Sequence, residues 1–163
     1  MYVAVSGGGD ASDAVCQLAE EVGRALARRG AIVVTGGLGG VMEAASRGAK
    51  AEGGITVGIL PTGDRADVNR WVDVAIPTGM GEARNALVVR AADAVIAVEG
   101  GFGTLSEIAL ALRLGTPVVG LGTWELARDG RPVEAIVVAA TPAEAAETAV
   151  RLATERPAPP TGS

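Results

Sequence analysis

Two glycine-rich segments, with two charged residues near them, are the parts of this sequence best suited to chemistry. The segments are Gly36-Gly37-Leu38-Gly39-Gly40-Val41-Met42 and Gly100-Gly101-Phe102-Gly103-Thr104, and an expected helix follows each. Unpaired backbone N–H groups and the positive end of the helix dipole favour a phosphate at such a helix N-terminus. Glycine also simply permits a tight strand-to-helix turn, so one loop alone indicates little. Two such loops at one edge of a sheet favour a phosphate site.

Arg84 and Glu107 are the charged residues with the strongest functional interpretation. Arg84 falls in the first turns of a helix expected from Met80 to Ala92, where a cation opposes the helix dipole, so we expect it to face an anionic ligand. A surface or dimer-interface arginine is the alternative. Glu107 ends Thr104-Leu105-Ser106-Glu107, a capping-box pattern in which the carboxylate bonds the backbone of the cap residue. Its functional alternative is a carboxylate that contacts a sugar hydroxyl or stabilises an oxocarbenium ion.

The composition excludes several classes of protein. The 163 residues include no histidine and one cysteine, Cys16, which rules out Ser–His and Cys–His catalysis, a disulfide framework and a thiolate metal site. Neither glycine loop is a Walker loop or a dinucleotide fingerprint, which argues against hydride transfer with NAD. The net charge of -5 argues against a nucleic-acid partner. With no membrane-length apolar run and no signal-peptide pattern, we expect a cytoplasmic protein without a membrane partner.

Alternating strands and helices are expected to position these residues. Apolar runs predict strands at residues 2–6, 31–35, 55–60, 71–76, 94–98, 117–121 and 135–139. Helices are predicted from an Asp10 cap to about Gly30, and at residues 41–51, 80–92, 104–114 and 142–155. This pattern predicts a doubly wound, Rossmann-like three-layer α/β sandwich with a mostly parallel sheet of about seven strands. We expect one domain over residues 1–156 and a flexible tail over residues 157–163.

Two longer motifs resemble those of a known family. Gly79-Met-Gly-Glu-Ala-Arg-Asn85 and the stretch from Ala92 to Glu107, which ends in Gly-Gly-Phe-Gly-Thr-Leu-Ser-Glu, resemble the LOG-like superfamily, formerly labelled "lysine decarboxylase-like". That superfamily contains cytokinin-activating phosphoribohydrolases and molybdenum cofactor carrier proteins. Glu99 stands where the hydrolases have proline, and Asn85 where they have lysine, and both departures resemble the carrier group. The old label does not apply, because Lys50, the only lysine, is expected far from the glycine loops.

The resemblance implies a function and a site. It implies a molybdenum cofactor carrier-like protein that binds a small phosphorylated ligand, of the nucleotide or pterin-phosphate type, with no required cofactor. The alternative is a nucleoside 5′-monophosphate phosphoribohydrolase, with Arg84 and Glu107 as its catalytic pair and AMP or a cytokinin riboside monophosphate as substrate. A nucleotide-sensing module without chemistry is a third hypothesis. The resemblance also implies a homodimer or higher oligomer, with helices around Leu87 and Leu110 at the interface. The expected ligand-binding residues are Gly7, Gly8, Gly36, Gly37, Gly39, Gly40, Val41, Met42, Asn85, Gly100, Gly101, Phe102, Gly103 and Thr104.

Overall fold

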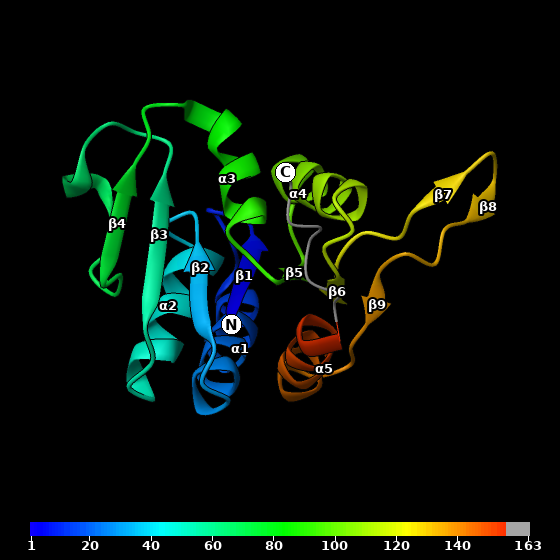
Figure 1. The fold of residues 1–163 in the computed structure, drawn as a ribbon, viewed down its shortest axis with the longest axis horizontal. Coiled ribbons are helices and arrows are strands. Elements are labelled where there is room, and N and C mark those ends of the chain that lie inside the picture. The colour runs from blue at the N-terminus through cyan, green and yellow to red at the C-terminus, as the bar shows by residue number, and fades with distance from the viewer. Residues whose placement is uncertain (156–163) are drawn as a thin grey trace, which may run out of the picture.

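The chain folds around one seven-stranded sheet in which every pair of neighbouring strands is parallel. This computed structural model describes residues 1–155. The strand order is β4-β3-β2-β1-β5-β6-β9, and Figure 1 shows the first four of these side by side. The predicted fold class is therefore confirmed. The strands of the sheet are β1 (Tyr2–Gly7), β2 (Ile32–Thr35), β3 (Thr56–Leu60), β4 (Val74–Pro77), β5 (Ala94–Val98), β6 (Val118–Leu121) and β9 (Val137–Val138).

Strand β1 lies at the point where the strand order reverses. It pairs with β2 on one side, with Val3 opposite Val33, and with β5 on the other, with Val3 opposite Ala94. The chain winds outward from β1 in both directions, so the loops after β1 and β5 diverge and leave a crevice at the carboxyl edge of the sheet. The topology thus places the glycines that follow β1, Gly7 to Gly9, and the Gly100–Thr104 loop on opposite sides of one crevice.

Helices cover both faces of the sheet. The helices are α1 (Asp13–Arg28), α2 (Val41–Ala51), α3 (Asn85–Arg90), α4 (Phe102–Arg113) and α5 (Pro142–Glu155), with short 3-10 turns η1 (Arg65–Asp67) and η2 (Gly81–Arg84). Val3 and Val5 point into a core with α1, α2 and α5, whereas Ala4 points into a second core with α3 and α4. All five residues of β5 are buried, as a central parallel strand between two helical layers requires.

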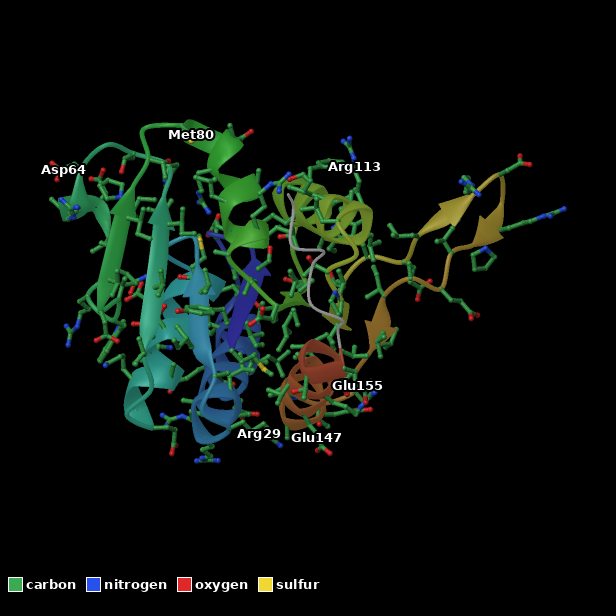
Figure 2. All side chains as sticks on the ribbon, viewed as in Figure 1. Arg29, Asp64, Met80, Arg113, Glu147 and Glu155 are labelled. Carbon is green, nitrogen blue, oxygen red and sulfur yellow. The ribbon has the colours of Figure 1, made fainter. Side chains whose placement is uncertain are left out.

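Helices α1 and α2 pack unusually closely, and glycine makes this possible. A Cβ added to Gly23 would overlap the Ala45 carbonyl oxygen, and one added to Gly48 would overlap the Glu20 carbonyl oxygen. A salt bridge reinforces the contact, because Glu20 of α1 pairs with Arg47 of α2 at 2.8 Å as well as with Arg24 of its own helix. Figure 2 shows a looser pair, Arg29 and Glu147, where α1 meets α5; their charged atoms are 3.8 Å apart. Part of the glycine excess therefore serves helix packing rather than a ligand.

Three of the predicted helices differ from those in the structure. The first helix is capped by Ser12, whose hydroxyl accepts from the Val15 N–H at 3.3 Å, and not by Asp10. The helix expected from Met80 to Ala92 is instead η2 followed by the six-residue α3, because Gly79 and Gly81 take left-handed backbone angles (φ 63° and 56°). Helix α4 begins at Phe102, two residues before the predicted start at Thr104.

A hairpin that the sequence pattern indicated only as a turn stands away from the body. Strands β7 (Ala127–Arg128) and β8 (Arg131–Pro132) pair antiparallel, and their turn residues Asp129 and Gly130 have φ of 53° and 72°. Figure 1 shows this hairpin projecting on the side opposite β4. No helix within residues 1–155 is long and apolar enough to cross a membrane. The tail predicted over residues 157–163 lies outside the described residues.

Candidate functional site

A cavity of about 430 Å³ opens at the carboxyl edge of the sheet. Residues from the ends of β1, β2 and β3 line it together with residues of η2, α3 and α4, so it occupies the crevice where the strand order reverses. Met80, labelled at the top of Figure 2, marks this edge, toward which the strands point. The predicted site residues that line the cavity are Gly7, Gly8, Gly36, Met42, Arg84, Asn85, Gly101, Gly103, Thr104 and Glu107.

The other predicted site residues do not line the cavity. Gly40 takes a φ of 61°, and a Cβ there would overlap the Gly8 carbonyl oxygen, so its role is to let two loops touch. The Val41 N–H stabilises this contact by donating a hydrogen bond to the same Gly8 oxygen at 3.0 Å. Gly100 has a φ of 95° and lies against Thr104. The predicted ligand-binding residues that are not among those lining the cavity are Gly37, Gly39, Gly40, Val41, Gly100 and Phe102.

Arg84 is buried in the wall of the cavity, and its Nε atom makes no hydrogen bond to the described residues 1–155. Only 8% of the residue is exposed. The guanidinium packs against Gly36, where a Cβ would overlap Nη1, so glycine is needed there to admit the arginine. Burial lowers the pKa of Arg84 below its usual range, and the negative charge of Glu107 partly opposes that shift. A buried cation with a free donor creates a strong demand for an anion.

Glu107 lies in the same cavity and is held by the end of β1. It is 7% exposed, and the Ser6 hydroxyl donates a hydrogen bond to its Oε2 atom. Burial raises the pKa of the Glu107 carboxyl, while the Ser6 hydrogen bond and the Arg84 charge act in the opposite direction. The capping-box interpretation is wrong, because α4 is capped by Gly101 and Thr104 already lies inside the helix. One turn into the helix, Glu107 makes its hydrogen bond across to the sheet.

The N-terminus of α4 is open to the cavity. No side chain caps it, and the N-cap residue Gly101 lines the cavity together with Gly103 and Thr104 of the first turn. A Cβ added to Gly101 or Gly103 would meet no atom of the described chain within 4 Å. The first N–H groups of a helix have no partner within it, and glycine keeps the approach to them free.

The residue before this loop has an uncommon backbone conformation. Glu99 has a φ of 48°, and its carbonyl oxygen accepts from the Thr123 hydroxyl at 2.5 Å. Proline, fixed near -65°, cannot adopt this conformation. The loop of this chain therefore differs in its backbone, as well as in sequence, from one that begins with proline.

The cavity also contains residues that the sequence analysis missed, namely Val5, Ser6, Gly9, Leu38, Pro61 and Glu82. Ser6 carried a usable signal, because it is the polar residue at the end of an otherwise apolar buried run. Glu82 also carried one, because it precedes Arg84 by two residues on the same short segment.

Comparison with known proteins assigns the family. Residues 1–150 match the model of the SLOG cluster4 family. The chain belongs to the SLOG cluster4 family. A similar sequence, an uncharacterized protein of Archaeoglobus fulgidus, is 45% identical over 122 residues, which are 74% of this chain and 80% of that protein.

Solved structures similar to this SLOG protein include molybdenum cofactor proteins. The Moco carrier protein of Chlamydomonas reinhardtii has a TM-score of 0.82 and 36% identity, with 95% of this chain and 98% of that chain covered. The molybdenum cofactor binding protein of Rippkaea orientalis has a TM-score of 0.80 and 35% identity, with 94% and 95% covered. The LOG-like resemblance, with its carrier-group character, is thereby confirmed.

A hydrolase of the LOG type is a weaker match. A probable cytokinin riboside 5′-monophosphate phosphoribohydrolase of Oryza sativa subsp. japonica is 36% identical over 93 residues. The aligned part covers 55% of this chain but only 38% of the rice protein.

Proposed function

We propose that this protein binds a small phosphorylated ligand of the pterin-phosphate or nucleotide type, in the manner of a molybdenum cofactor carrier. The observation that carries the proposal is the buried Arg84 guanidinium, which has a free Nε donor at the base of a cavity lined by glycine backbone. An anion in the cavity would neutralise the charge of this buried guanidinium. The similarity to Moco carrier and binding proteins supports the pterin type.

The residues present fit a phosphorylated pterin. Backbone N–H groups of the first turn of α4, around Gly101 and Gly103, would hold the phosphate, and the Thr104 hydroxyl is available beside them. The buried Arg84 guanidinium would neutralise the phosphate charge, and the exclusion of water around it would strengthen the attraction between the two groups. The cavity of about 430 Å³ is of the size that holds one small ligand. The bound group would supply its own chemistry to an acceptor protein, and this chain would shield and release it.

Isothermal titration calorimetry with dihydroneopterin monophosphate, GMP, AMP and inorganic phosphate tests the proposal. We expect saturable binding of at least one phosphorylated heterocycle, tighter than that of inorganic phosphate. The Arg84→Ala variant should lose at least tenfold in affinity, since a hydrogen bond to a charged group contributes roughly 1.5–3 kcal/mol. Absence of saturable binding of all four probes to the wild-type protein would refute the function.

A second candidate function is hydrolysis of the N-glycosidic bond of a nucleoside 5′-monophosphate. The observation that favours it is Glu107, a buried carboxyl in the same cavity as Arg84. In that reaction Glu107 would assist the attack of water on the ribose carbon, and the base would leave with a proton. Incubation with AMP or a cytokinin riboside monophosphate should then release the free base, detectable by chromatography. An equal rate in Glu107→Gln would exclude this role for the carboxylate.

We further propose a homodimer in which a second copy covers the face formed by α3 and α4. Leu87 and Leu110 are only partly buried there, and Phe102 at the start of α4 is 81% exposed. Light scattering coupled to size exclusion tests this, and a monomer at micromolar concentration would contradict it. The cytoplasmic location stays a prediction.

A further inference from the structure

The wall of the cavity formed by η2 and the start of α3 carries three polar side chains in a row of four residues. Glu82, Arg84 and Asn85 all line the cavity. Arg84 is buried, Asn85 is half-buried, and Glu82 is exposed and so stands nearer the mouth. The loops after β1, β2 and β5 instead contribute backbone, through Gly7, Gly8, Gly36 and Gly101. Polar side chains therefore line the cavity from this segment, in addition to Ser6, Thr104 and Glu107 on β1 and α4.

Glu82 has no partner for its carboxylate among residues 1–155. No hydrogen bond or salt bridge joins it to any described side chain, although Arg84 is two residues away and also lacks an acceptor. No side-chain hydrogen bond joins the Asn85 amide to any residue of the described range 1–155. A carboxylate at the mouth of an anion-binding cavity repels a phosphate, so its presence there calls for a ligand group that donates hydrogen bonds.

Heterocyclic rings differ in what they offer such a carboxylate. A 2-amino-4-oxo ring, as in pterin and guanine, presents two adjacent N–H donors, which the two oxygens of a carboxylate accept together. A 6-aminopurine presents an amine beside a ring nitrogen whose lone pair repels a carboxylate oxygen. A carboxylate discriminates between two ligands when one offers it donors and the other faces it with a lone pair. The two ring types are therefore separable by one glutamate.

We propose that Glu82, assisted by the Asn85 amide, recognises the 2-amino-4-oxo edge of the ligand ring while Arg84 and the α4 N-terminus bind its anionic part. This inference rests on the proposed function and specifies it, because it selects pterin and guanine compounds over adenine compounds. The test compares GMP with AMP, which share ribose and phosphate and differ in the ring edge.

The decisive variant is Glu82→Gln. A glutamine side chain pairs with the amine and neighbouring ring nitrogen of adenine, so the substitution should remove the preference for GMP and strengthen the binding of AMP. The matched control is Glu21→Gln, an exposed glutamate of α1 that does not line the cavity. It makes the same change in net charge at a distant site.

Calorimetric titration of GMP, AMP, dihydroneopterin monophosphate and inorganic phosphate into the three proteins gives the result. We expect wild type and Glu21→Gln to bind GMP roughly 10- to 100-fold more tightly than AMP, the discrimination that a bidentate pair provides. Glu82→Gln should lose that preference and bind AMP more tightly than wild type does, because a negative charge near the phosphate is removed.

The outcomes separate this inference from the proposed function. Equal binding of GMP and AMP by wild type, or an unchanged GMP preference in Glu82→Gln, overturns the role of Glu82 while phosphorylated-ligand binding stands. Failure of all four probes to bind wild type overturns the proposed function and this inference with it.

Discussion

Replacing Arg84 with methionine should stabilise the unliganded protein and abolish ligand binding. The guanidinium is 8% exposed, its Nε atom lacks an acceptor within residues 1–155, and burial lowers its pKa, so its charge is held at a cost to folding. A buried polar group without a partner costs about 1–3 kcal/mol. Methionine keeps the packing of the aliphatic part of the side chain without the charge, but not the contact of Nη1 and Cζ with Gly36.

The expected gain is roughly 1–2 kcal/mol in the free energy of unfolding, somewhat less than the full penalty because methionine does not fill the site perfectly. For a chain of this size, about 2–4 °C in Tm accompany each kcal/mol, so the shift is measurable. Arg84 also lowers the pKa of Glu107 through its charge, and that attraction is lost in the variant. Repeating the substitution in a Glu107→Gln background separates the two effects in a double-mutant cycle.

Urea unfolding in phosphate-free buffer measures the stability change, and thermal unfolding with added ligand measures binding. A ligand that binds only the folded state raises Tm, so wild type should respond to a phosphorylated heterocycle and Arg84→Met should not. Arg113→Met is the control: this arginine lies exposed in the last turn of α4 and is labelled in Figure 2. If Arg84→Met were destabilised by 1 kcal/mol or more without ligand (about a factor of 5 in the folding equilibrium), Arg84 would be structural and the reasoning refuted.

Two further predictions concern α4. Burial raises the pKa of Glu107 above its ordinary 4.5, so wild type should lose stability as pH rises from about 4.5 through the raised value. Glu107→Gln should not show this loss. In urea unfolding, its gain in the free energy of unfolding over wild type should be absent at lower pH and should grow as pH rises through that window. Gly103→Ala should stabilise α4 by roughly 0.5 kcal/mol, since alanine favours a helix and its Cβ meets no described atom. The same methyl group should weaken ligand binding in calorimetry, and unchanged affinity would place the ligand elsewhere.

The sheet was predictable because its inner strands are buried on both faces. Strand β5 reads Ala-Val-Ile-Ala-Val and is buried throughout, so its composition alone identifies it. The edge strand β4 alternates between exposed and half-buried residues, and β9 has two exposed valines, so both carry a weaker signal. Their positions follow from pairing with β3 and β6, which a local pattern does not encode.

The sequence indicates which residues form the candidate site better than it indicates how they are positioned. Arg84 was selected because a cation at a helix start opposes the dipole, yet it is η2 and the glycines beside it that bring the arginine into the cavity. For Glu107 the local capping-box pattern favoured a structural role, whereas the observed partner is Ser6, 101 residues away in sequence. Local patterns identify strands and helices better than they identify helix ends, and a contact between distant segments depends on the sheet order.

An acidic protein can serve an anionic ligand because the relevant field is local. With a net charge of -5, the surface as a whole repels a phosphate, but exposed charges are screened within about 10 Å at ordinary salt. Inside the cavity, Arg84 and the open end of α4 act at short range and without that screening. In the proposed complex Glu82 would add selectivity, because the ligand would have to supply donors to Glu82 as well as an anion to Arg84. Free phosphate meets one of these demands, and a phosphorylated heterocycle with a donor edge meets both.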